Sequence, residues 1–137
     1  MTSSLRFVFD TNTIISALLI PVSKPRQAFD RAQDRGKILI SMPALWELNE
    51  IIVRKKFDKY VSEEKRKGFL AALVKQAEFS EITETVTDCR DAKDNKFLEL
   101  AVCGGADCII SGDADLLVLH PFRGIRILRP QQFLKEF

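Results

Sequence analysis

The chain alternates short runs of β-favouring residues with longer segments in which apolar residues recur at helical spacing, and this alternation limits the possible folds. The runs that we expect to form strands are residues 5–9, 37–40, 108–111 and 125–128. The segments that we expect to form helices are residues 14–19, 25–35, 41–52, 63–79, 91–102, 116–119 and 130–137. Strands that alternate with helices in this way predict an α/β fold, a parallel sheet with helices on both faces.

The chain is expected to form one domain. Its 137 residues, of which 46% are hydrophobic, suffice to bury one core. No linker, repeat or low-complexity segment divides it, so we expect a single domain over residues 1–137. No apolar run reaches the length of a membrane span, and Asp10 and Asn12 interrupt the apolar stretch near the N-terminus. Neither a membrane segment nor a signal peptide is therefore expected.

The net charge and the cysteines exclude few classes of function. The formal net charge of +2 neither identifies nor excludes a protein that binds nucleic acid. The three cysteines, Cys89, Cys103 and Cys108, form no C-x-x-C pair, and their number is odd. A disulfide framework and a structural zinc site are therefore not expected, and we expect a cytoplasmic location.

Acidic residues occur where the predicted strands end. Asp10 ends the first strand and Asp113 follows the strand at 108–111, whereas Glu47 and Asp94 lie early in predicted helices. Ligands of parallel α/β sheets bind outside the carboxyl ends of the strands, so these four residues are candidates for a site. Each position also suits a helix cap or an acid in the first turn of a helix, and that structural interpretation stays open.

The helical spacing around two of these acids favours a shared site. Asp94 lies one turn before Phe97, along the buried stripe of its helix, and Glu47 shares a helical row with Ala44 and Ile51. Carboxylates that converge on one place repel each other unless a cation lies between them. Carboxylates without nearby histidine or cysteine suit hard ions, so we expect Mg²⁺ or Mn²⁺. His120, the only histidine, lies in a predicted loop and is not the expected general base.

Four stretches resemble, in order, the motifs of PIN-domain nucleases. They are residues 9–17 (beginning Phe-Asp-Thr-Asn-Thr), 41–51 (with Glu47), 91–101 (Asp-Ala-Lys-Asp-Asn at its start) and 106–117 (with Ser-Gly-Asp-Ala-Asp). The similarity covers nearly the whole chain, and it is greatest to bacterial and archaeal PIN proteins described as toxins of toxin–antitoxin pairs.

The resemblance implies a three-layer α/β/α sandwich and a metal-dependent endoribonuclease that cuts single-stranded RNA. It implies Asp10, Glu47, Asp94 and Asp113 as catalytic, metal-binding residues, with Asp115 as a further ligand or a support. Thr11, Asn12, Asn95 and Ser111 would support the acids by hydrogen bonds, although they also suit turns and caps. The implied partners are a cognate antitoxin protein and a second copy of the chain in a homodimer.

Basic residues provide candidate contacts for RNA phosphates. One group lies between two predicted helices and comprises Lys55, Lys56, Lys65, Arg66 and Lys67. Arg123, Arg126 and Arg129 form a second group near the C-terminus. The first group also suits a solvated helical tip, because acidic residues dilute it. Trp46 and Tyr60 are candidates for stacking on a base, or else for packing.

Two other functions remain open from the sequence. A haloacid-dehalogenase-like phosphatase also carries an aspartate after its first strand, but it usually has a second acid two residues later, where this chain has Asn12. A PIN module without catalytic activity would bind RNA or a protein partner, but it would have no need of the full set of acids.

Overall fold

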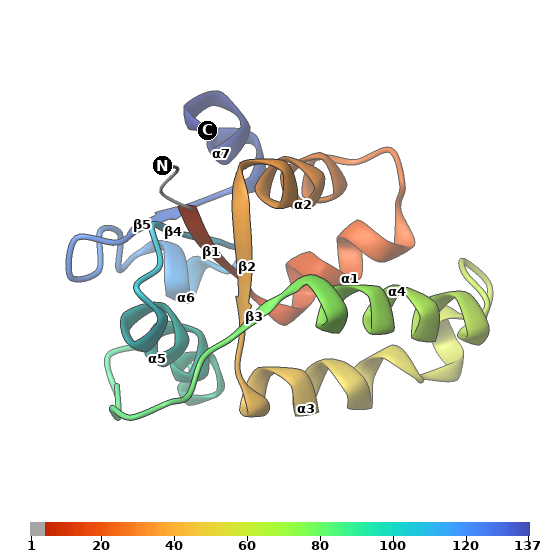
Figure 1. Cartoon of the computed structure of the whole chain (residues 1–137), viewed down its shortest axis with the longest axis horizontal. Coiled ribbons are helices and arrows are strands. Elements are labelled where there is room, and N and C mark those ends of the chain that lie inside the picture. The colour runs from red at the N-terminus through yellow and green to blue at the C-terminus, as the bar shows by residue number, and fades with distance from the viewer. Residues whose placement is uncertain (1–4) are drawn as a thin grey trace.

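A five-stranded parallel sheet forms the centre of the computed structural model, which describes residues 5–137. The strands are β1 (Leu5–Phe9), β2 (Gly36–Ile40), β3 (Glu78–Phe79), β4 (Cys108–Ile110) and β5 (Arg126–Leu128). Their order across the sheet is β3-β2-β1-β4-β5 (Figure 1). Because the chain adds strands first on one side of β1 and then on the other, the order reverses between β1 and β4. Such a reversal opens a crevice at the carboxyl ends of these two strands.

Helices cover both faces of the sheet, as the sequence predicted. One face carries α1 (Thr11–Leu19), α2 (Lys24–Arg35), α4 (Glu63–Gln76) and α7 (Pro130–Glu136), with much of α3 (Met42–Ile52). The other face carries α5 (Asn95–Gly104) and α6 (Ala114–Leu117). Two 3₁₀ turns, Lys55–Phe57 and Ala92–Asp94, complete the chain. The expected three-layer α/β/α sandwich is confirmed. Of the single domain expected over residues 1–137, residues 1–4 lie outside the described part.

Alternate residues of the central strand build two separate cores. Phe7 and Phe9 of β1 face the layer of α1, α2 and α7, where the Phe7 ring packs edge-on against Phe133 with ring centroids 5.2 Å apart. Val8 faces the opposite core, where it joins Leu98 of α5. All three β1 residues are buried, as a strand covered by helices on both faces requires.

Short polar side chains begin the helices that follow the strands. Asp10 accepts a hydrogen bond from the Thr13 N–H at 2.8 Å and so begins α1 directly after β1. Ser41 does the same for Ala44 at the start of α3, directly after β2. These caps satisfy donors that a helix start leaves free, so each strand turns sharply into its helix.

The helix predicted over residues 63–79 ends earlier than expected. α4 stops at Gln76, and Glu78–Phe79 pairs with β2, placing Glu78 opposite Leu39 and Phe79 opposite Ile40. The prediction was wrong at this end because the edge of β2 offers backbone hydrogen bonds that helical propensity does not outweigh. Within residues 5–137, no helix is both long enough and apolar enough to cross a membrane.

Candidate active site

Asp10 lies at the carboxyl end of β1 and is only 4% exposed. One carboxylate oxygen accepts the N–H of Thr13, and the other accepts the hydroxyl of Ser111, which follows β4. Burial raises the pKa of Asp10, and the negative charge of Asp113 adds to the rise, although the hydrogen bonds from Ser111 and Thr13 oppose it. Asp10 is therefore a helix cap and a member of an acidic cluster at once.

Asp113 is held close to Asp10 by the same serine. The Asp113 N–H donates to Ser111 Oγ at 2.9 Å, and the Asp113 carboxylate accepts the N–H of Asp115 at 2.8 Å at the start of α6. Asp115 does not line the cavity that the other acids share. Its backbone carbonyl accepts the thiol of Cys89 at 3.5 Å.

Asp94 has the most unusual environment of the acids. It lies where the 3₁₀ turn Ala92–Asp94 meets α5, and Asp91 caps that turn by accepting the Lys93 N–H at 3.1 Å. Of the buried side-chain oxygens and nitrogens within residues 5–137, only Asp94 Oδ2 has no hydrogen-bond partner. Burial, the side-chain contact with Asp113 and the charges of Asp113, Asp91 and Asp10 raise the pKa of Asp94 to about 7.

Glu47, on α3, is bound on both carboxylate oxygens. One oxygen accepts the Thr11 hydroxyl, and the other lies 3.1 Å from the ammonium of Lys96. The ion pair is partly buried, with side-chain exposures of 28% for Glu47 and 18% for Lys96. Lys96 was not among the predicted site residues. Its partner Glu47 lies 49 residues away in sequence, so no local sequence pattern indicates the pair.

A cavity of about 350 Å³ brings these acids together. Asp10, Glu47, Asp94 and Asp113 all line it, so the structure places the four predicted residues around one space. Two further acidic side chains also line this cavity, Glu50, which is exposed, and Asp91, which is half-buried, as do Arg54 and Lys93.

The donor set fits a hard divalent cation, although the side chains are not already arranged as ligands. Carboxylates line the cavity without histidine or cysteine, and the bare Asp94 Oδ2 is the kind of atom that a cation would bind. Over the described range 5–137, no three histidine, cysteine, aspartate or glutamate side chains stand in an arrangement that could hold a metal ion. Glu47 accounts for part of this, because Lys96 and Thr11 hold its carboxylate.

The four predicted supporting residues behave differently from one another. Ser111 and Thr11 donate to acids of the cluster, namely Asp10 and Glu47. The side chain of Asn95 instead accepts the backbone N–H of Cys89 at 2.8 Å and so holds the loop before α5. Asn12 is exposed and lines the acidic cavity.

Arg66 does not belong with the basic residues proposed to contact RNA. Its side chain is fully buried, and its guanidinium donates to the backbone carbonyls of Ile52, Val61 and Arg54 and to the Asp58 carboxylate. Arg66 therefore ties the end of α3 to the start of α4, which sequence spacing did not reveal.

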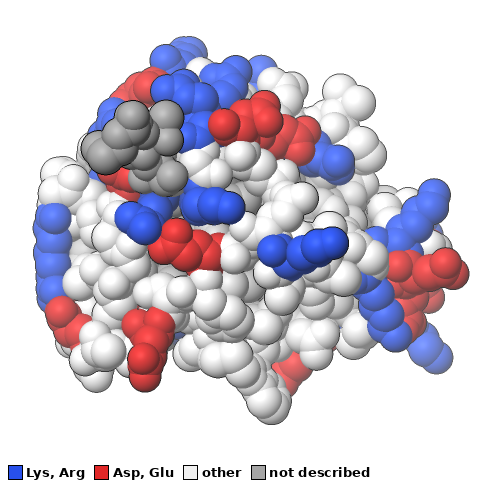
Figure 2. Space-filling model, viewed as in Figure 1, with Lys and Arg blue, Asp and Glu red and all other residues white. Residues whose placement is uncertain are grey.

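The lysines of that group are exposed. They are Lys55, Lys56, Lys65 and Lys67, of which Lys67 pairs with Glu63 at 2.8 Å. Figure 2 shows basic and acidic side chains interleaved at the end of the molecule where α3 connects to α4. Trp46 and Tyr60 are also exposed, at 64% and 60%, so they do not serve as core packing.

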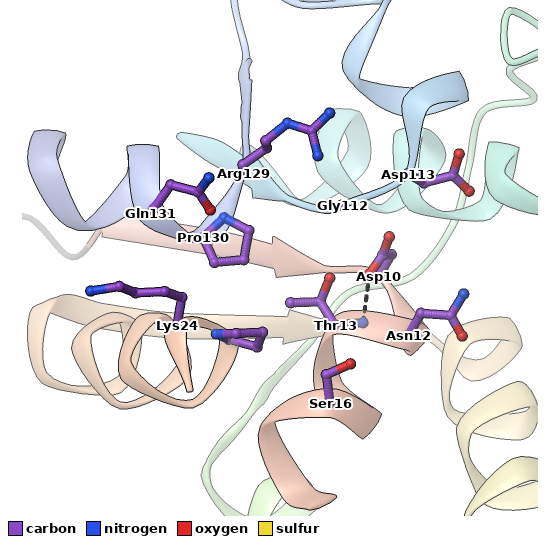
Figure 3. Close-up of a pocket in the computed structure, with 11 residues that line it drawn as sticks. Asp10, Asn12, Thr13, Ser16, Lys24, Gly112, Asp113, Arg129, Pro130 and Gln131 are labelled. Carbon is purple, nitrogen blue, oxygen red and sulfur yellow. Dashed lines mark hydrogen bonds between the residues drawn. The ribbon is translucent and has the colours of Figure 1, made fainter. Parts of the chain in front are cut away.

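A second cavity, of about 470 Å³, adjoins the acidic one (Figure 3). Asp10, Asn12 and Asp113 line both cavities, so the two meet at these residues. Lys24 and Arg129 line the second cavity as well. The other members of the C-terminal basic group have acidic partners, Arg123 with Glu84 and Arg126 with Glu136.

Comparisons with known proteins agree with this architecture. An uncharacterized protein of the archaeon Methanocaldococcus jannaschii is 30% identical, over 97% of this chain and 92% of the relative. Crystal structures of DNA-bound VapBC2 from Rickettsia felis and of DNA-bound VapBC from Salmonella typhimurium contain similar chains. Both have a TM-score of 0.59, at 15% and 19% identity, and the matches cover 91% and 92% of this chain and 98% of each of those chains.

A third similar structure is PAE2754 from Pyrobaculum aerophilum, with a TM-score of 0.59 and 12% identity over 96% of this chain and 88% of that one. At these identities the solved structures establish the fold alone. A PIN-domain family model matches residues 6–115, which include all four acids of the cluster. The chain belongs to the PIN domain family.

Proposed function

We propose that this protein is a metal-dependent endoribonuclease, which hydrolyses phosphodiester bonds of single-stranded RNA with Asp10, Glu47, Asp94 and Asp113. PIN-domain proteins are generally nucleases, so membership of the family supports hydrolysis of a phosphodiester. The acids lie at the reversal point of the sheet, where α/β proteins bind their ligands.

The observation that carries the proposal is the bare oxygen of Asp94. A buried carboxylate oxygen without a donor destabilises the fold, and the negative charges of Asp113, Asp91 and Asp10 increase that cost. A structural cap would have a donor, as Asp10 and Asp113 do. A binding site for a divalent cation explains why the fold keeps Asp94 in this position.

Mg²⁺ or Mn²⁺ bound among these acids would activate water and neutralise charge on the phosphodiester. Asp10, Asp94 and Asp113 are the residues that would hold the ion. Ser111 contacts both Asp10 and the backbone of Asp113, and the Thr13 N–H fixes the rotation of the Asp10 carboxylate. The hydrogen bonds of Ser111, Thr13 and the Asp115 N–H thus hold two of these three carboxylates, those of Asp10 and Asp113.

Glu47 would join this set after a small rearrangement. Its carboxylate lines the same cavity but is held by Lys96 and Thr11. Lys96 also donates to the backbone carbonyl of Lys93, so its ammonium keeps one partner if Glu47 turns toward the other acids. In the absence of a cation, Lys96 offsets one negative charge of the cluster.

The cellular role that we propose is the toxin of a toxin–antitoxin pair in the cytoplasm, with a cognate antitoxin protein as partner and a homodimeric toxin. The fold similarity to chains of the two VapBC complexes supports this role. Exposed apolar side chains on α3 and α4, such as Trp46 and Val74, provide a surface for protein contacts.

Cleavage of a labelled single-stranded RNA by the purified protein tests the proposed activity. We expect cleavage with Mn²⁺ or Mg²⁺, loss in EDTA, and recovery when the metal is added back. An Asp113→Asn variant purified in parallel controls for contaminating nucleases and should be inactive. Full cleavage in EDTA, or equal cleavage by Asp113→Asn, would overturn the proposal.

A further inference from the structure

The two cavities adjoin at the acidic cluster. Asp10, Asn12 and Asp113 line both of them, with the other cluster acids on one side and Lys24 and Arg129 on the other. The second cavity, at about 470 Å³, has the size of an ordinary ligand pocket. A strand of RNA with its reacting phosphate at the acids would therefore continue into a pocket lined by two basic side chains, Lys24 and Arg129.

The elements that line the pocket place these two basic residues on opposite walls. Lys24 opens α2, and Arg129 precedes α7, which packs against α2. The Arg129 N–H donates to Gln132 at 3.0 Å, and this bond anchors its backbone at the start of α7. In Figure 3 the Arg129 side chain extends toward the loop that carries Gly112 and Asp113, and Lys24 extends the opposite way along the pocket.

Neither of these two basic side chains forms an ion pair with an acidic residue in the described part of the chain. Within residues 5–137 the ion pairs closer than 4 Å include those of Arg123 and Arg126, but none of Lys24 or Arg129. Both side chains are exposed and remain available to an anion from solution. Arginine binds phosphate oxygens in a bidentate manner and holds its charge at any pH, so it suits a fixed phosphate contact.

We propose that this second cavity holds the RNA strand on one side of the cleaved bond. Arg129 binds the phosphate next to the one that reacts, and Lys24 binds a phosphate farther along. The inference rests on the proposed function and adds to it the direction in which the strand leaves the acids. Arg129 acts as a positioning residue, since it orients the strand without touching the reacting atoms.

Binding of single-stranded RNA in EDTA, measured by fluorescence anisotropy, tests the inference without catalysis. Arg129→Gln and Lys24→Gln should each weaken binding roughly fivefold, as expected for an exposed ion pair. Each should also reduce the slope of log affinity against log salt by about one. Lys135→Gln is the matched control, because Lys135 is exposed near the end of α7, carries the same charge and does not line the pocket. Its affinity should remain close to that of wild type.

A second measurement locates the contact. Each phosphate near the cleaved bond is replaced in turn by an uncharged methylphosphonate, and the affinity of wild-type protein is measured. We expect the loss to fall on one side of the bond, and the replacement at the adjacent phosphate to cost Arg129→Gln little further. Because the wild-type scan needs no variant, it decides the matter even if a variant fails to fold.

The outcomes separate this inference from the proposed function. If wild type neither binds nor cleaves single-stranded RNA, the proposed function fails. If wild type cleaves RNA but both pocket variants bind like Lys135→Gln, or the methylphosphonate losses are equal on both sides of the bond, the strand does not follow this pocket and the cleavage activity still stands.

Discussion

The hydroxyl of Ser111 donates to the Asp10 carboxylate across 101 residues of sequence, and the same oxygen accepts the backbone N–H of Asp113. One buried serine thus links the acid that follows β1 to the acid that follows β4. Because β1 and β4 are neighbours in the sheet, this link holds the Asp113 backbone beside the Asp10 carboxylate.

Ser111→Ala should therefore impair both the fold and the site. It removes the donor to Asp10 and leaves the Asp113 N–H without its acceptor, so we expect a loss of about 1–3 kcal/mol in unfolding free energy. RNA cleavage should fall at least tenfold. Ser41→Ala is a matched control, since Ser41 is equally buried and caps α3 without contacting the acids. Chemical denaturation and cleavage rates check both variants, and equal activity in the two would contradict the role of Ser111.

The raised pKa of Asp94 gives the metal-free protein a specific dependence on pH. Asp94 has a pKa of about 7 in the folded protein, against an ordinary value of 3.8. Between these two values the folded chain holds a proton that the unfolded chain releases, so stability falls as pH rises and the loss is complete above about 7.

Asp94→Asn should remove this pH dependence. In EDTA, the melting temperature of wild type should drop relative to that of Asp94→Asn between pH 5 and pH 8, and the two should be closer at the lower pH. If the melting temperatures of the two proteins change by the same amount with pH, the environment of Asp94 does not favour its protonated form.

Arg66→Ala should destabilise the protein strongly. The variant leaves three backbone carbonyls without their donor around the junction of α3 and α4, so we expect a loss of about 3 kcal/mol or more. Lys67→Ala removes the neighbouring charge from an exposed position and should cost less than about 1 kcal/mol. Urea denaturation measures both, and similar losses in the two variants would argue against a structural role for Arg66.

Lys96→Gln should strengthen metal binding. Lys96 places a positive charge beside the acidic cavity and competes for Glu47, so its removal should favour a divalent cation by about 1 kcal/mol, or roughly fivefold in affinity. Calorimetric titration with Mn²⁺ measures the change. Weaker binding by the variant would mean that Lys96 positions Glu47 for the metal instead of competing with it.

Much of this structure was predictable from local sequence, because strands and helix starts are determined by nearby residues. The four acids that line one cavity were candidates for this reason, since Asp10 and Asp113 follow strands and Asp94 and Glu47 lie on inward helical rows. The strand Glu78–Phe79 was missed because its formation depends on the edge of β2, which is distant in sequence.

The partners of the charged side chains were not predictable in the same way. Lys96 meets Glu47 across 49 residues, and Arg66 is buried only because the connection between α3 and α4 folds around it. The sequence alone does not distinguish a solvated charged side chain from a buried one. The second cavity escaped prediction for a similar reason, because Lys24 and Arg129 come from opposite ends of the chain.

The comparison of Asp94→Asn with Asp91→Asn tests the central claim most directly. Both residues line the acidic cavity, but Asp91 caps a 3₁₀ turn, a role that asparagine fills about equally well, whereas Asp94 carries the bare oxygen. The measurement is the melting temperature with and without Mn²⁺, together with RNA cleavage by the same preparations. We predict that Asp94→Asn is more stable than wild type in EDTA, gains little from Mn²⁺ and loses cleavage by orders of magnitude, while Asp91→Asn resembles wild type. If Asp94→Asn instead cleaves RNA normally and gains as much stability from Mn²⁺ as wild type does, these acids are not the active site.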